Sequence, residues 1–198
     1  MSFQAVEEFE RTIADFYGAP YAVATDCCTH AVELCLRLTG ATEVSCPAHT
    51  YISIPFTFTK LGLQWHFRKE EWADYYYIGN TNIIDAAVHF KQGGYVTDSL
   101  MCLSFQFKKP LGLGRGGAIL CSSPDEYVAL KKMSYDGRYG DTAWAKQDID
   151  TIGYHYYMTP ETAQQGIDKL PSVAAKQWPQ WSWNNYPNLT DMTVFDGK

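Results

Sequence analysis

The stretch YAVATDCCTHAVEL, residues 21–34, combines a short apolar strand, a turn and the start of a helix. Residues 21–24 have the length and apolar character of a buried strand. Helical sequence begins near Thr29 and continues to Leu38, and Gly40 stands where such a helix should end. A strand that leads through a tight turn into a helix is typical of α/β folds.

The same alternation of strands and helices continues along most of the chain. Pro55 must lie in the first turn of its helix or mark a kink, because an interior proline costs about 3 kcal/mol. Pro171 is expected to follow the end of the last helix. We predict an α/β fold with a mainly parallel sheet flanked by helices. Further strands are expected at residues 44–46, 63–67, 83–86, 100–105 and 118–121, and further helices at 6–16, 50–61, 123–133 and 159–170.

Composition excludes several classes of protein. The 198 residues carry a net charge of −6, which argues against nucleic-acid partners, since these are bound through cationic surfaces. No run of 18 apolar residues occurs, so a membrane span is not expected, and the N-terminus lacks a secretory pattern. The six cysteines form no CxxC pair, which favours reduced thiols in the cytoplasm and no metal site.

The last part of the sequence differs from the rest. Residues 1–170 are predicted to form one ligand-binding domain, and residues 171–198 an irregular arm rich in Trp, Pro and Asn. Aromatic residues make up 15% of the chain, a high share that indicates an interface or a ligand site. Trp178, Trp181 and Trp183 are expected to anchor the arm by packing.

Ligands of α/β folds bind beyond the carboxyl ends of strands. This rule indicates three places: the turn after Ala24, the strand end at Asp85, and the segment after Phe105. The first turn opens a helix, so its free N–H groups form either an ordinary capped helix or a phosphate site. Asp85 is either a cap or ion-pair partner, or the partner of a protonated heterocyclic nitrogen.

The third place carries two adjacent lysines. The sequence runs Ser104-Phe-Gln-Phe-Lys108-Lys109 and is followed by Gly112, Gly114, Gly116 and Gly117. Two neighbouring lysines usually form a solvated surface. A lysine at a strand end inside a cleft can instead have a lowered pKa and form a Schiff base.

A phosphate site, a strand-end Asp and a strand-end Lys, in this order, are the parts of a pyridoxal-phosphate site. The sequence resembles the DegT family of sugar aminotransferases, which are fold type I pyridoxal-phosphate enzymes. The matching stretches, in family order, are YAVATDCCTHAVEL (21–34), CPAHTYIS (46–53), IDAA (84–87), SFQFKKPLGLGRGG (104–117), MSYDGR (133–138) and GYHYYMTPETAQQGIDKL (153–170).

The resemblance implies a role for each site residue. Lys109, five residues after Ser104, falls on the Schiff-base position and would also shuttle a proton between substrate and cofactor. Asp85 would pair with the pyridine nitrogen, and Tyr51 would stack on the ring. The phosphate would be held by Cys28, Thr29 and Ser104, with His89 near the cofactor and His155 reaching a phosphate across a dimer interface.

The implied reaction moves an amino group from glutamate to a nucleotide-linked keto sugar, in a cytoplasmic homodimer with a shared active site. Two alternatives stay open. One is a pyridoxal-phosphate decarboxylase, lyase or racemase acting on a small amino acid, and the other is a non-catalytic family member.

The sequence also departs from the family pattern. Only 15 residues separate Phe67 from Ile83, where the family has a longer crossover, and the chain ends soon after Leu170. We therefore expect a reduced large domain in a shortened form that lacks the C-terminal small domain. Single residues also differ from the family pattern. Cys27-Cys28 stands where the family has Ser-Gly, and Val88 stands where it has Gln or His, with His89 one position later. Arg115 replaces an acidic residue, and Tyr157 replaces an Arg.

Overall fold

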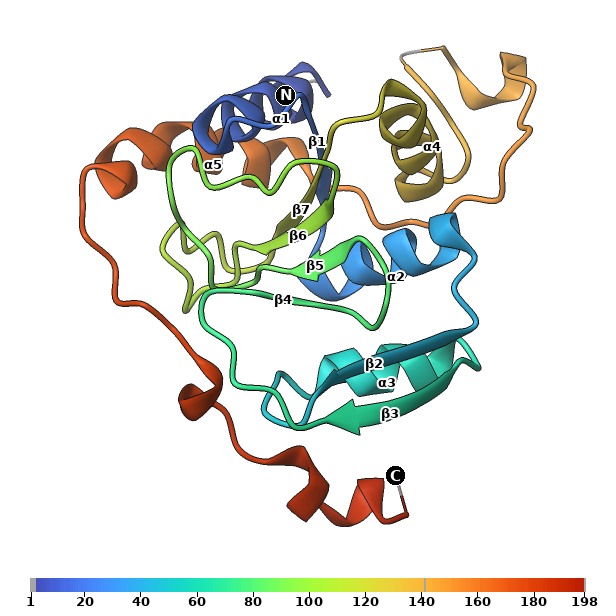
Figure 1. Cartoon of the computed structure of the whole chain (residues 1–198). Helices are drawn as coiled ribbons and strands as arrows, with labels where there is room; N and C mark the ends of the chain where they lie inside the picture. Colours follow the sequence, from blue (N-terminus) through green and yellow to red (C-terminus); the bar gives the residue numbers. More distant parts are fainter. Residues whose placement is uncertain (1–2, 141, 198) are drawn as a thin grey trace.

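The main sheet has five strands and forms the middle of the molecule (Figure 1). The computed structural model describes residues 3–140 and 142–197. Four of its strands lie where the sequence predicts them, whereas the remaining strand, Tyr76–Tyr77, is too short for a periodic pattern. In spatial order the strands are β1 (Tyr21–Thr25), β7 (Gly117–Cys121), β6 (Leu100–Ser104), β5 (Ile83–Asp85) and β4 (Tyr76–Tyr77).

The main sheet is mostly antiparallel, so the prediction of a mainly parallel sheet was wrong. β7 runs antiparallel to both β1 and β6, and β4 runs antiparallel to β5. Residues 105–116 join β6 to β7 through turns alone, and a chain that returns without a crossover lays down an antiparallel neighbour. β5 and β6 are the parallel pair of the described main sheet.

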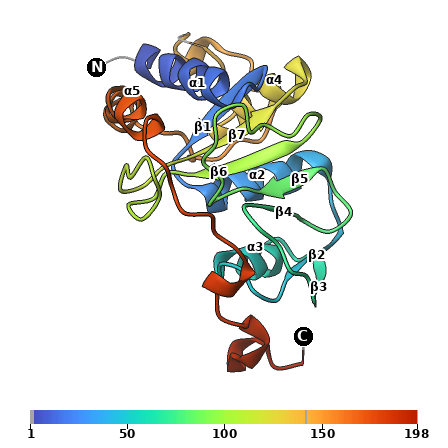
Figure 2. The same ribbon diagram turned by 60° about the vertical axis from the view of Figure 1, so that its left-hand side comes forward.

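Helices cover both faces of the main sheet, as an α/β fold requires (Figures 1 and 2). α1 (Gln4–Tyr17) and α5 (Pro160–Ala174) lie together on one face, and α2 (Cys28–Thr39) and α4 (Pro124–Ser134) lie on the other. Alternate residues of β1 divide between the two cores, because successive strand side chains point to opposite faces. Ala22 and Ala24 pack with α1, whereas Val23 packs with α2.

A second, smaller layer lies beyond α2. Its strands β2 (Glu43–Pro47) and β3 (Gln64–Arg68) are parallel, and α3 (Ser53–Lys60) is the crossover between them. The helix begins at Ser53 rather than at residue 50, so Pro55 lies in its first turn. A proline is tolerated there because the first N–H groups of a helix have no partner within it.

α5 continues through Pro171 to Ala174, so the predicted end near Leu170 was wrong. Leu170 and Val173 are both buried in the core that α1 shares. Their burial favours continuation of the helix, against the cost of about 3 kcal/mol that an interior proline imposes. None of the helices within residues 3–140 and 142–197 is long and apolar enough to cross a membrane.

The arm that follows α5 runs down one side of the molecule to the small layer (Figure 1). As far as residue 197, it contains three short 3-10 helices, Trp183–Asn185, Leu189–Asp191 and Thr193–Phe195. The Trp183 N–H donates to the carbonyl of Trp72 (3.0 Å), and the Leu189 N–H donates to the carbonyl of Ala48 (2.9 Å). These contacts hold the arm against the edge of the cavity described next.

Candidate functional site

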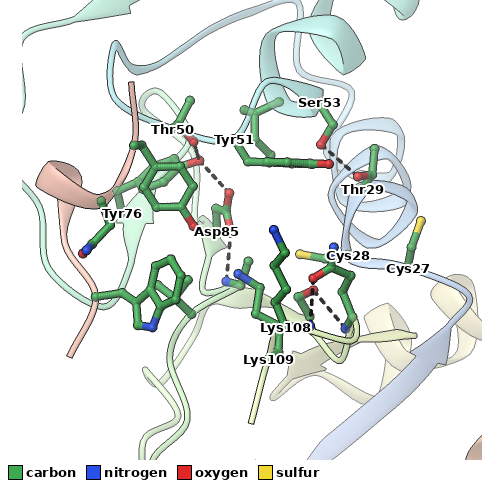
Figure 3. A pocket seen from close by; sticks show the side chains of 18 of the residues that line it. Cys27, Cys28, Thr29, Thr50, Tyr51, Ser53, Tyr76, Asp85, Lys108 and Lys109 are labelled. Carbon is green, nitrogen blue, oxygen red and sulfur yellow. Dashed lines mark hydrogen bonds between the residues drawn. The ribbon is translucent and has the colours of Figure 1, made fainter. Parts of the chain in front are cut away.

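A cavity of ≈ 490 Å³ opens where β1, β5 and β6 end. The three places that the strand-end rule indicates therefore meet in one site (Figure 3). Six of the eight predicted site residues line the cavity: Cys28, Thr29, Tyr51, Asp85, Ser104 and Lys109.

Asp85 is a buried carboxylate at the end of β5, with 6% of its surface exposed. Its Oδ2 accepts a hydrogen bond from the Tyr76 hydroxyl (2.6 Å), and its Oδ1 accepts one from the Ala87 N–H (3.0 Å). Burial raises the pKa of Asp85, while these two hydrogen bonds and the nearby Lys109 act in the opposite direction. A buried acid in a ligand cavity is suited to pair with a cationic group of the ligand.

Lys109 lies across the cavity from Asp85 (Figure 3). Burial lowers the pKa of its amine, and the negative charge of Asp85 opposes this effect. The Nζ atom lies 5.1 Å from the centre of the Trp181 ring, a side chain of the arm. A lysine with a lowered pKa is a better nucleophile and proton acceptor than a solvated one.

The N-terminus of α2 forms another wall of the cavity. Cys27 precedes the helix and makes no side-chain cap, so the first N–H groups can face a ligand anion. Asp26 pairs with His30 and with Arg115, each at 2.6 Å. Burial opposes the imidazolium, but the interactions with Asp26 and Cys27 raise the pKa of His30 to about 9.

Thr29, in α2, and Tyr51, just before α3, line the cavity where these two helices begin. The Thr29 hydroxyl shares a hydrogen bond with that of Ser53 (2.9 Å), which ties α2 to α3. Tyr51 is 56% exposed, so its ring is free to lie against a ligand. Burial raises the pKa of Cys28 well above its ordinary value, so this thiol is neutral.

The two predicted histidines lie outside this cavity. His89 is buried beside Tyr17, and its Nε2 is 3.2 Å from the carbonyl oxygen of Gly94. His155 is exposed, and its Nδ1 is 3.0 Å from a carboxylate oxygen of Asp136. His89 lines a neighbouring cavity that shares Lys109 as a wall. The role of His155 across a dimer interface stays a prediction.

The sequence did not indicate several of the residues that line the cavity. Tyr76 lies in a two-residue strand, and Trp181 and Tyr186 lie in the irregular arm, where no periodicity marks them. A signal was available for Ser53, which sits two residues after Tyr51 in a stretch that resembles the family. The further lining residues are Cys27, Thr50, Ile54, Trp72, Ala87, Val88, Gln106, Lys108, Arg115, Gly116 and Asn185.

If the chain binds pyridoxal phosphate, as the family resemblance implies, we expect Gly117→Ala to weaken that binding about tenfold or more while the protein stays folded. A Cβ at Gly117 would lie 2.5 Å from the carbonyl carbon of Cys27 and from the nitrogen of Cys28, so the backbone of this turn would have to move. The measurement is an absorbance titration with pyridoxal phosphate. The control is Gly62→Ala, which strains a surface turn at φ 68° without meeting any neighbour. Equal weakening in both variants would contradict this prediction.

The sequence profile of the DegT/DnrJ/EryC1/StrS aminotransferase family matches residues 1–68 and 83–178. The chain belongs to this family. A curated relative is the 3-amino-5-hydroxybenzoate synthase of Amycolatopsis mediterranei (strain S699), which is 42% identical over 65 residues. That match covers 31% of this chain and 17% of the relative. The unmatched residues 69–82 lie where the sequence indicates a shortened crossover.

Several solved structures share the fold of this chain. A 3-amino-5-hydroxybenzoic acid synthase aligns with 86% of this chain and 56% of its own, at 22% identity and a TM-score of 0.70. AtS13 from Actinomadura melliaura aligns with 85% and 60%, at 20% identity and a TM-score of 0.74. The sugar aminotransferase CalS13 from Micromonospora echinospora aligns with 85% and 60%, at 16% identity and a TM-score of 0.70. The chain thus spans less than two thirds of these relatives.

Proposed function

We propose that this chain binds pyridoxal phosphate and transfers an amino group from glutamate to a nucleotide-linked keto sugar. The observation that carries the proposal is one cavity with three features: the buried carboxylate of Asp85, the half-buried amine of Lys109 and the N-terminus of α2. The family uses this cofactor. The sugar substrate is inferred from relatives such as CalS13, which is a sugar aminotransferase.

The residues of the cavity fit this cofactor. The uncapped N-terminus of α2 offers N–H groups to a phosphate, and Gly117 leaves the Cys27–Cys28 backbone in a position that a Cβ would disturb. His30 and Arg115 add positive charge beside that turn. Asp85 would face the ring nitrogen. When bound, pyridoxal phosphate supplies an aldehyde carbon and an electron-accepting ring.

The chain's own groups then have distinct tasks. Lys109 would hold the cofactor through its Nζ and, once released, accept the α-proton of the amino donor at the same atom. Its lowered pKa favours both, because the neutral amine is the reactive form. Tyr51 would cover the ring face, and the hydroxyls of Thr29 and Ser104 would bind the phosphate.

We also propose a cytoplasmic homodimer with a shared active site. The support is a run of exposed apolar side chains close in sequence to His155: Tyr139, Trp144, Ile149 and Ile152. The free state of all six cysteines supports a reducing compartment. Sedimentation of the full chain should give twice the mass of one copy, and a single-copy mass would contradict the shared site.

The proposed reaction is tested by its first half-reaction, the transfer of the amino group from glutamate to the cofactor. Glutamate added to the protein loaded with pyridoxal phosphate should release 2-oxoglutarate, while the amino group and two electrons move to the cofactor and convert it to pyridoxamine phosphate. Absorbance follows the cofactor, and mass spectrometry identifies the keto acid. Loss of the α-hydrogen or of CO₂ without a keto acid would favour a lyase, racemase or decarboxylase. No reaction with any amino donor would contradict the proposal.

A further inference from the structure

A buried tyrosine is hydrogen-bonded to the carboxylate of Asp85 in the wall of the cavity. Tyr76 is 3% exposed and belongs to β4, within residues 69–82 that the family profile leaves unmatched. β4 pairs antiparallel with β5 so that Tyr76 lies opposite Asp85. On its other side, the Tyr76 hydroxyl is hydrogen-bonded to the Thr50 hydroxyl (Figure 3).

The hydrogen bonds in this group run in one direction. A tyrosine hydroxyl has a single proton, and that of Tyr76 is donated to Oδ2 of Asp85 at 2.6 Å. The Thr50 hydroxyl must therefore donate to the Tyr76 oxygen. The donors therefore run from Thr50 through Tyr76 to Oδ2 of Asp85. The other carboxylate oxygen, Oδ1, accepts a hydrogen bond from the Ala87 N–H, so both oxygens have a donor.

This direction matters because a buried carboxylate is costly unless donors stabilise its charge. Burial keeps the pKa of Tyr76 well above its ordinary value, so the phenol remains a donor. Burial also raises the pKa of Asp85, and the hydrogen bond from Tyr76 opposes that rise. The other titratable groups that face Asp85 are the thiols of Cys28, Cys46 and Cys102, the phenol of Tyr186 and the amine of Lys109.

Those thiols and the second phenol have raised pKa values and are neutral near pH 7, so they add no charge next to Asp85. The amine of Lys109 lies on the cavity side, but it would be engaged in holding the cofactor. Tyr76 and the Ala87 N–H therefore remain as the donors that stabilise the carboxylate independently of Lys109, and Tyr76 is the side-chain donor of the two.

We infer that Tyr76, oriented by Thr50, is a positioning residue that keeps the Asp85 carboxylate ionised and directed at the ring nitrogen of the cofactor. The inference rests on the proposed function and adds to it a residue outside the part of the chain that matches the family. It assigns to the unmatched segment 69–82 a task in the cofactor site.

The test is the affinity for pyridoxal phosphate as a function of pH. Tyr76→Phe removes one hydroxyl and should weaken binding about tenfold or more, since a hydrogen bond to a charged group is lost. The acid limb of the binding profile should move to higher pH, because the Asp85 carboxylate loses a donor and takes up a proton more readily. The matched control is Tyr77→Phe, a neighbouring tyrosine that is 41% exposed, which should bind within about twofold of the natural chain.

A double-mutant cycle separates positioning from a general structural role. In an Asp85→Asn background, Tyr76→Phe should change the affinity less than about twofold, since its partner charge is gone. An equal loss in both backgrounds, or an unmoved acid limb, would overturn the inference. If Tyr76→Phe does not fold, Thr50→Val serves instead and should weaken binding severalfold, whereas unchanged affinity would overturn the inference.

The two proposals fail in different ways. If the natural chain takes up no pyridoxal phosphate at any pH, the proposed function and this inference fall together. If the natural chain binds the cofactor and Tyr76→Phe binds it with the same affinity and pH profile, the positioning role alone is wrong.

Discussion

Lys109→Ala is expected to reduce the rate of amino transfer by at least about a thousandfold, because one side chain would both hold the cofactor and move the α-proton. The amine is half-buried in the cavity, its pKa is lowered by burial, and it faces Asp85. The measurement is the rate of 2-oxoglutarate release from glutamate under single-turnover conditions, with pyridoxal phosphate in excess over the protein.

The neighbouring lysine provides the control. Lys108 is exposed, and its Nζ lies 5.6 Å from the centre of the Phe107 ring. Lys108→Ala should therefore retain most of the rate, with at most a few-fold loss from its place at the rim of the cavity. A large loss in Lys108→Ala together with a small one in Lys109→Ala would show that the roles of the two lysines are reversed.

Asp85→Asn is expected to lower the rate about a hundredfold or more, because a neutral amide cannot stabilise a protonated ring nitrogen as a carboxylate does. The free energy of unfolding should stay within about 1 kcal/mol of the natural chain or rise, since the substitution removes a buried charge. The two effects are measured by the glutamate half-reaction and by urea unfolding.

The combination of low activity and retained stability distinguishes a functional carboxylate from a structural one. The control is Asp98→Asn, an exposed residue at φ 61°, a backbone conformation that asparagine adopts readily. If Asp85→Asn unfolds easily and its residual folded fraction reacts at the natural rate, Asp85 serves the fold and not the reaction.

The strand ends were the most predictable part of the molecule. The apolar residues before Asp85 and Ser104 mark buried strands, and the rule that ligands bind at strand ends needs no knowledge of strand order. Six predicted residues therefore meet in one cavity even though the predicted sheet direction was wrong. Direction depends on how connections cross the sheet, and the pattern of residues 105–116 does not specify a path.

Other features depend on contacts distant in sequence and could not be predicted. Tyr76 reaches Asp85 through pairing of two very short strands, and Trp181 reaches Lys109 only because the arm folds back along the molecule. His89 follows the Asp85 strand closely in sequence, yet the chain turns at Ala86 and buries this side chain outside the cavity. Closeness in sequence was a poor guide to closeness in space at that position.

The most direct test of the account is to identify which lysine binds the cofactor. The full chain is incubated with pyridoxal phosphate, reduced with borohydride and digested, and the modified lysine is located by mass spectrometry. We predict one reduced pyridoxyl group, on Lys109. A label on Lys108 alone, or a label scattered over exposed lysines, would contradict it.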